Sequence, residues 1–195
     1  MGIDTSKIKE LREKTGLSVM ECKNALQEAN GSIEKAIEIL KKRGLEISEK
    51  NVEKEVKEGL IGSYVHTNGK IGVLIEVNCE TDFVAKNSEF LELVKNLTLQ
   101  IAAMKPKWVD IASIPEEILK EKTNEIKEQF KDKPQNILDK IVEDKLNDFY
   151  KENVLLKQTF IKNEEMTIEE YIKLKIAKLG ENIKIKRFVR FEVGE

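Results

Sequence analysis

Apolar residues recur at helical spacing through residues 5–44, and three interruptions divide them into short helices. The first helix is predicted to end at Gly16. The second begins with the capping-box pair Ser18 and Glu21 and ends at Asn30-Gly31. The third is predicted to close at Gly44, because glycine commonly follows the last helical turn. The apolar stripes predict a three-helix bundle; they comprise Ile8 and Leu11, then Val19, Cys22, Leu26 and Ala29, then Ile33, Ala36, Ile37 and Leu40.

A highly charged segment separates the predicted bundle from the rest of the chain. Residues 46–58 are mostly charged and contain no proline, so we expect a solvated helix or tether there. The predicted organisation is therefore a bundle at 1–45, a linker at 46–58 and a core at 59–195. A bundle of about 40 residues buries little surface on its own. Bundles this small usually bind partners, so the first part is predicted to be a docking module.

A small sheet is predicted for the core. Residues 60–66 and 71–77 flank a turn that contains Asn68-Gly69, which is a strong hairpin signal. A third strand alternates near the C-terminus, although Arg187 interrupts its apolar face. Two strands alone are unstable, so three antiparallel strands are expected. The apolar residues of the third strand are Ile183, Ile185, Val189, Phe191 and Val193.

Helices are predicted to cover this sheet. One spans residues 88–104, and another runs from Thr167 to Leu179. Between them, residues 116–152 read as two highly charged helices separated at Lys133-Pro134. Each has a narrow apolar stripe, which predicts a protruding antiparallel coiled-coil arm. The fold class is therefore α+β.

Composition excludes several functions. Charged residues make up 36% of the chain, but the net charge is only −2, so direct nucleic-acid binding is not expected. No apolar stretch approaches a membrane span, and the N-terminus has no signal-peptide pattern, so a cytoplasmic protein is predicted. Two cysteines and one histidine predict neither a disulfide scaffold nor a metal site.

Candidate sites are few, and each has a structural alternative. Cys79 and His66 would be a thiol nucleophile and its base, but nothing in the sequence suggests a third group to orient them. Val19 and Met20 form either a wide apolar face or an exposed patch beside Arg12.

The pair Asp82-Phe83 joins a strand to a helix. In one interpretation Phe83 enters the core and Asp82 caps the helix. In the other, the pair is exposed for binding.

Residues 81–87, TDFVAKN, resemble the signature of the translation elongation factor Ts family. The resemblance extends to residues 9–16 near the start and to 180–183 and 190–195 at the end. It covers nearly the whole chain in the expected order. There are departures, since many family members carry two related core halves and this chain has room for one. Glu21 also stands where the family usually has Asp, and Leu17-Ser18 replace a common Ala-Gly.

The resemblance implies a guanine-nucleotide exchange factor that acts on GDP-bound elongation factor Tu. It also implies a ubiquitin-associated-like bundle. The family's mechanism places Phe83 as a wedge in the partner and Asp82, within the segment Thr81 to Val84, near the magnesium ion that is displaced. The family's docking positions correspond to Arg12, Val19 and Met20. Because no bond is made or broken, neither catalytic residues nor a cofactor is expected.

Two further expectations concern assembly and alternatives. The missing second core half and an uncovered sheet edge predict a homodimer. A scaffold with no exchange activity is the main alternative, and a thiol enzyme that uses Cys79 is the other.

Overall fold

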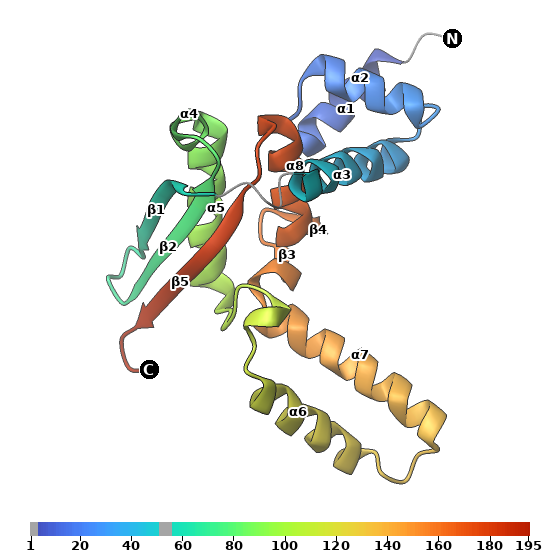
Figure 1. Cartoon of the computed structure of the whole chain (residues 1–195), viewed down its shortest axis with the longest axis vertical. Helices are drawn as coiled ribbons and strands as arrows, with labels where there is room; N and C mark the ends of the chain where they lie inside the picture. The colour runs from blue at the N-terminus through green and yellow to red at the C-terminus, as the bar shows by residue number, and fades with distance from the viewer. Residues whose placement is uncertain (1–3, 51–55) are drawn as a thin grey trace. The chain divides into compact units, whose positions relative to one another are not determined.

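The structure is a computed structural model that describes residues 4–50 and 56–195. The described residues form eight α-helices and five strands in two compact units, which confirms the α+β class (Figure 1). Of the described residues, unit 1 comprises 4–50, 56–61, 76–95 and 170–185, and unit 2 comprises 62–75, 96–169 and 186–195. The sheet and two of the helices contribute to both units. Within the described residues, no helix combines the length and apolarity that a bilayer crossing requires.

The first three helices pack together in unit 1, as the apolar pattern predicts. They are α1 (Thr5–Thr15), α2 (Val19–Glu28) and α3 (Ile33–Lys50). Gly16 ends α1 in the left-handed conformation, with φ of 68°. The capping box at the start of α2 is confirmed: the Ser18 amide donates to Glu21 Oε2 at 2.9 Å, and the Glu21 amide donates to Ser18 Oγ at 3.2 Å. The fully buried side chains include Leu11, Cys22, Ala25, Leu26 and Ala36.

The predicted end of the third helix at Gly44 is wrong. Helix α3 continues to Lys50, so the first part of the predicted linker is helical, while residues 51–55 lie outside the described residues. The reason for glycine is packing against α8 (Ile168–Leu179) in the same unit. A Cβ on Gly44 would lie 2.0 Å from the carbonyl oxygen of Lys173. Gly44 therefore permits a close approach of two helices.

The three-stranded sheet is confirmed. Its strands are β1 (Glu58–Val65), β2 (Ile71–Cys79) and β5 (Lys184–Glu192), in the order β1-β2-β5. Figure 1 shows β2 antiparallel to both neighbours, with α5 (Ser88–Met104) along one face. Alternate residues of β2 are buried, and Phe90, Leu93, Leu97 and Ile101 of α5 are fully buried.

The predicted apolar face of the third strand is wrong beyond Arg187. Lys186 and Arg187 are both exposed, and this pair shifts the alternation by one residue. The last part of β5 therefore turns Phe188 and Arg190 toward the covered side of the sheet, where Arg190 pairs with Glu192 at 2.5 Å. Three apolar residues near the C-terminus are consequently exposed, namely Val189, Phe191 and Val193.

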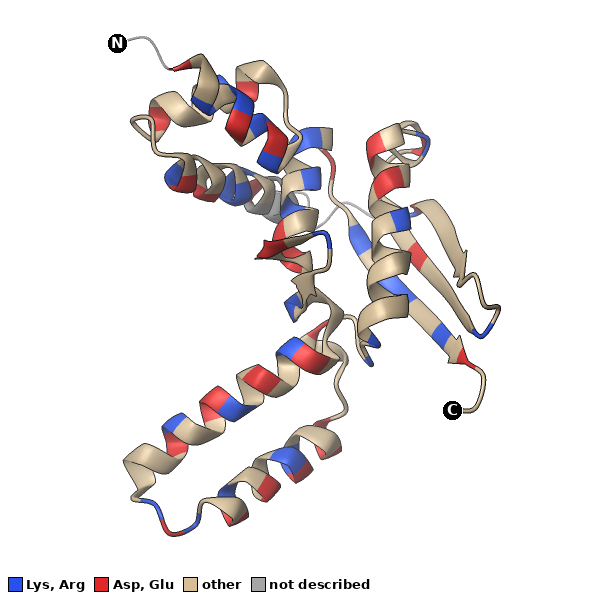
Figure 2. Cartoon of the chain, turned by 180° about the vertical axis from the view of Figure 1, so that it is seen from behind, with Lys and Arg blue, Asp and Glu red and all other residues tan. Residues whose placement is uncertain are grey.

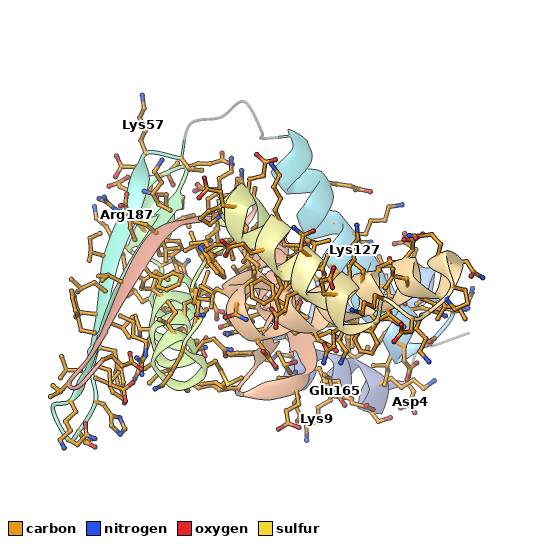
Figure 3. All side chains as sticks on the ribbon, turned by 90° about the horizontal axis from the view of Figure 1, so that it is seen from below. Asp4, Lys9, Lys57, Lys127, Glu165 and Arg187 are labelled. Atoms are coloured by element: carbon orange, nitrogen blue, oxygen red, sulfur yellow. The ribbon has the colours of Figure 1, made fainter. Side chains whose placement is uncertain are left out.

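The two charged helices of unit 2 are α6 (Glu116–Gln129) and α7 (Gln135–Asn153), and the break between them lies at Pro134 as predicted. They run antiparallel and side by side (Figures 1 and 2). Acidic and basic residues cover both helices (Figure 2), and side chains such as Lys127 project from the pair (Figure 3). Within the two helices, only Ile126 and Leu138 are buried. The pair therefore has a narrow apolar contact.

A small second sheet in unit 2 was not predicted. It pairs β3 (Thr159–Phe160) with β4 (Asn163–Thr167), which are too short for a clear alternating pattern. Two short 3₁₀ helices, Ile111–Ser113 and Leu155–Lys157, complete the connections around α6 and α7.

Candidate functional site

The site begins where β2 ends. Cys79 is the last residue of β2, and a one-turn helix, α4 (Asp82–Ala85), follows before α5. Thr81 caps this helix, because its hydroxyl oxygen accepts a hydrogen bond from the Val84 amide at 3.4 Å. Val84 and Ala85 are buried and anchor the turn. Phe83 points the other way and is 82% exposed.

The interpretation that puts Phe83 in the core and makes Asp82 the helix cap is therefore wrong. Thr81 takes the capping position, and Asp82 occupies the first helical turn. A Phe side chain left this exposed in the free protein is uncommon, because its burial is favourable by about 1.5–3 kcal/mol. The segment thus leaves an aromatic side chain exposed on the surface.

The residue before Phe83 is acidic. Asp82 Oδ2 lies 2.7 Å from Lys86 Nζ, one helical turn later. The hydrogen bond from Lys86 lowers the pKa of Asp82 below its ordinary value, so the carboxyl is ionised at neutral pH. The segment therefore places an exposed aromatic side chain beside an acid that is paired with Lys86.

The C-terminal part of unit 1 secures this turn. Glu181, in the connection between α8 and β5, accepts two hydrogen bonds from Thr81, at 2.6 and 3.0 Å. The Asn182 amide in turn donates to Glu80 Oε1 at 2.8 Å. Sequence reasoning missed these contacts. The only available signal was that 180–183 belonged to the family resemblance, which gave no role for the acid.

The second candidate surface lies on the bundle. Arg12 is exposed in the last turn of α1, and Val19 and Met20 are 50% and 62% exposed in the first turn of α2. The interpretation of Val19 and Met20 as a wide buried face is wrong, since Leu17 is buried in their place. The connection between α1 and α2 brings the three exposed residues to one end of the bundle.

Ion pairs within unit 1 connect the bundle to the helix that follows the site. Lys178 of α8 donates to the carbonyl of Gly16 and pairs with Glu89 of α5 at 2.7 Å. Lys175 pairs with the same Glu89 at 2.6 Å. Burial opposes the lowering of the Glu89 pKa, yet the hydrogen bonds from the two lysines hold it below its ordinary value. Both candidate surfaces therefore belong to one connected unit.

The thiols do not form a nucleophilic site. Burial, together with the nearby Glu181 carboxylate, raises the pKa of Cys79 to about 11, so the reactive thiolate is scarce at neutral pH. His66 instead shares a hydrogen bond with the Tyr64 hydroxyl, at 2.8 Å. Cys22 is buried in the bundle as predicted. Across the described ranges, no group of three or more potential metal ligands comes together.

Comparison with known proteins identifies a family whose sequences match this chain. The model of the family described as "Elongation factor TS" matches residues 4–195. Elongation factor Ts of Thermosipho melanesiensis is 52% identical over 195 residues, which cover 99% of this chain and all of the relative. That of Fervidobacterium nodosum is 51% identical and covers all of both chains. Elongation factor Ts of Thermotoga maritima is 49% identical over 195 residues, covering all of this chain and 98% of the relative. The chain, with its exposed Phe83 between a sheet strand and a covering helix, belongs to the elongation factor Ts family of translation elongation factors.

Proposed function

We propose that this protein is a guanine-nucleotide exchange factor for elongation factor Tu and that the segment from Thr81 to Val84 promotes release of GDP. The observation that carries the proposal is the 82% exposure of Phe83 on a turn whose neighbours are buried. An apolar side chain mounted in this way loses little conformational freedom when it enters a partner. Family membership supplies the identity of that partner.

Phe83 acts as a wedge between structural elements of the GTPase. Asp82 and its neighbours act close to the magnesium ion, which holds the nucleotide phosphates to the GTPase. A carboxylate that competes for the ion, or the loss of one of the ion's ligands, weakens its hold on the nucleotide. No covalent step is involved, so the protein needs neither a catalytic residue nor a cofactor.

Exchange is then a coupling between two binding sites. If the factor weakens GDP binding by some ratio, GDP weakens binding of the factor by the same ratio. The factor therefore recognises the GDP-bound form and holds the nucleotide-free form more tightly.

The bundle at residues 1–45, which we propose to be ubiquitin-associated-like, docks on the same partner through Arg12, Val19 and Met20. The observation in favour is that all three side chains are exposed at one end of the bundle. The core at 59–195 carries the wedge, and α6 with α7 forms a coiled-coil arm. We place the protein in the cytoplasm, where translation takes place.

We also propose a homodimer. The outer side of the sheet in unit 2 exposes five apolar residues, and contiguous apolar patches of this kind are uncommon on monomers. A second copy fits because the two faces are identical, so a twofold axis would pair apolar with apolar. The residues are Val65, Leu74, Val189, Phe191 and Val193.

The wedge is tested by Phe83→Ala. Truncating an exposed side chain should leave the melting temperature nearly unchanged. Loss of about 1.5–3 kcal/mol of burial in the complex corresponds to a roughly ten- to hundredfold slower release of GDP. The measurement is release of fluorescent GDP from purified elongation factor Tu, with melting followed on the same preparation.

Met104→Ala is the matched control, because Met104 is also a large exposed apolar residue but lies at the far end of α5. It should release GDP at the parental rate. If Phe83→Ala also keeps the parental rate, the wedge is refuted. If the parental protein binds elongation factor Tu without accelerating release, the protein is a scaffold and not an exchange factor.

A further inference from the structure

The two oxygens of one carboxylate engage both donor groups of the residue that caps α4. Glu181 Oε2 accepts from the Thr81 amide at 3.0 Å, and Glu181 Oε1 accepts from the Thr81 hydroxyl at 2.6 Å. The two residues are 100 positions apart in the sequence. Hydrogen bonds to an ionised carboxylate are shorter and roughly twice as strong as those between neutral groups. This contact therefore fixes Thr81 from outside its own loop.

The contact also sets the direction of the helix cap. A hydroxyl has one proton to donate, and Thr81 gives that proton to Glu181. The lone pairs of the hydroxyl oxygen are then left to accept from the Val84 amide. Because an ionised carboxylate only accepts, Glu181 forces the Thr81 hydroxyl into the orientation that caps α4.

The remaining group of Thr81 is satisfied locally. Its carbonyl accepts from the Ala85 amide at 3.2 Å and from the Cys79 thiol at 3.2 Å. The raised pKa of Cys79 keeps that thiol protonated and able to donate. Every polar group of Thr81 therefore has a buried or half-buried partner, which leaves it one conformation.

A helix of one turn needs such support. Forming the first turn orders several residues for a single hydrogen bond, so isolated turns are unfavourable. Helix α4 has four residues, and Phe83 contributes almost no burial to it. The stability of α4 therefore depends on its cap, on the buried Val84 and Ala85, and on the contact from Glu181.

We propose that Glu181 is a positioning residue for nucleotide release: it holds Thr81, and through Thr81 the turn that aims Phe83 at the partner. The inference rests on the proposed function, because it assigns Glu181 a role in the same wedge. Glu181 acts through Thr81 and makes no contact of its own with nucleotide or magnesium.

The test uses Glu181→Gln in the full chain. Glutamine has one acceptor oxygen, so one of the two hydrogen bonds from Thr81 is lost. Hydrogen exchange of the Val84 amide, measured on the free protein, should become roughly tenfold faster, and catalysed GDP release should slow by roughly tenfold, as expected for one charge-assisted hydrogen bond. Glu92→Gln is the control, because it removes a paired carboxylate from α5 in the same unit. It should change neither quantity.

A double-mutant cycle with Thr81→Val separates positioning from direct contact. Valine keeps the shape of threonine and removes the hydroxyl, so Glu181→Gln should slow release less in that background than in the parent. Additive losses, or slower release with unchanged Val84 exchange, would mean that Glu181 contacts the partner itself and would overturn the inference. So would Glu181→Gln with parental exchange and parental release.

Failure of the wedge is distinguishable from failure of this inference. If Phe83→Ala releases GDP normally, the proposed function fails, and Val84 exchange alone decides whether Glu181 holds α4. If Phe83→Ala slows release but Glu181→Gln does not, only the positioning role is refuted. Should Glu181→Gln unfold, Thr81→Val provides the same two measurements without removing the charge.

Discussion

Replacement of Gly44 by alanine distinguishes two roles for this glycine by the sign of the effect on stability. Gly44 lies inside α3, and helical glycine is ordinarily less favourable than alanine by roughly 0.5–1 kcal/mol. With free space around it, Gly44→Ala would therefore stabilise the protein. The structure leaves no such space. A Cβ at this position would meet the carbonyl oxygen of Lys173 at 2.0 Å and its carbonyl carbon at 2.8 Å.

The obstacle is backbone and cannot rotate away. Helices α3 and α8 would have to separate by more than an ångström, which also disturbs the Lys41–Glu170 ion pair one turn earlier, now 2.6 Å long. Overpacking of this kind costs about 1–3 kcal/mol and outweighs the gain in helix propensity. For a chain of this length each kcal/mol corresponds to roughly 2–4 °C, so we expect a melting temperature lower by several degrees.

Thermal unfolding followed by circular dichroism measures this shift, with Gly72→Ala as the control. Gly72 lies in β2, has no heavy atom within 4 Å of the point that a Cβ would occupy and has no positive φ, so alanine should be neutral or slightly stabilising there. If Gly44→Ala melts at or above the parental temperature, the close approach of α3 to α8 does not exist. The glycine would then not be required for helix packing.

Two further predictions concern unit 2. Phe191→Glu should abolish the proposed homodimer, because it would put a charge into an apolar contact. The monomer should stay folded, since Phe191 is 67% exposed. Sedimentation at micromolar concentration should then show only the monomer mass, and an unchanged dimer would refute this face as the interface. Gln100→Leu should lower the free energy of unfolding by about 2–5 kcal/mol in urea titrations, because it removes the hydrogen bonds that Gln100 makes with the Ile161 amide, the Thr159 carbonyl and the Oε1 atom of the buried Gln158. A cost below about 1 kcal/mol would mean that this network is not important for stability.

Local patterns in the sequence determined most of the elements. The capping box at Ser18, the left-handed glycine at Gly16 and the proline before α7 act through contacts within one turn. Such contacts form between residues close in sequence and depend little on where the segment is placed, so the sequence alone reveals them. The alternation along β2 and the stripe of α5 likewise predict which faces are buried.

Contacts between residues far apart in the sequence determined the features that local patterns did not predict. Gly44 reads as a helix end until Lys173 is placed against it. The sequence shows that Arg187 interrupts the apolar face of β5, but it does not show that Arg190 then turns toward the carbonyl of Ala102. The sequence left open whether Phe83 is buried or exposed, because sequence patterns count apolar residues and do not show which of them the fold can cover.

At the candidate site, too, the sequence indicated one part and the tertiary structure another. The sequence, through its resemblance to a family, marked residues 81–84, but it gave no role to Glu181. Thr81 and Glu181 meet only because β2 and the connection before β5 end side by side in unit 1. A hydrogen bond between residues 100 positions apart has no periodicity and no fixed spacing, so only the tertiary structure determines it.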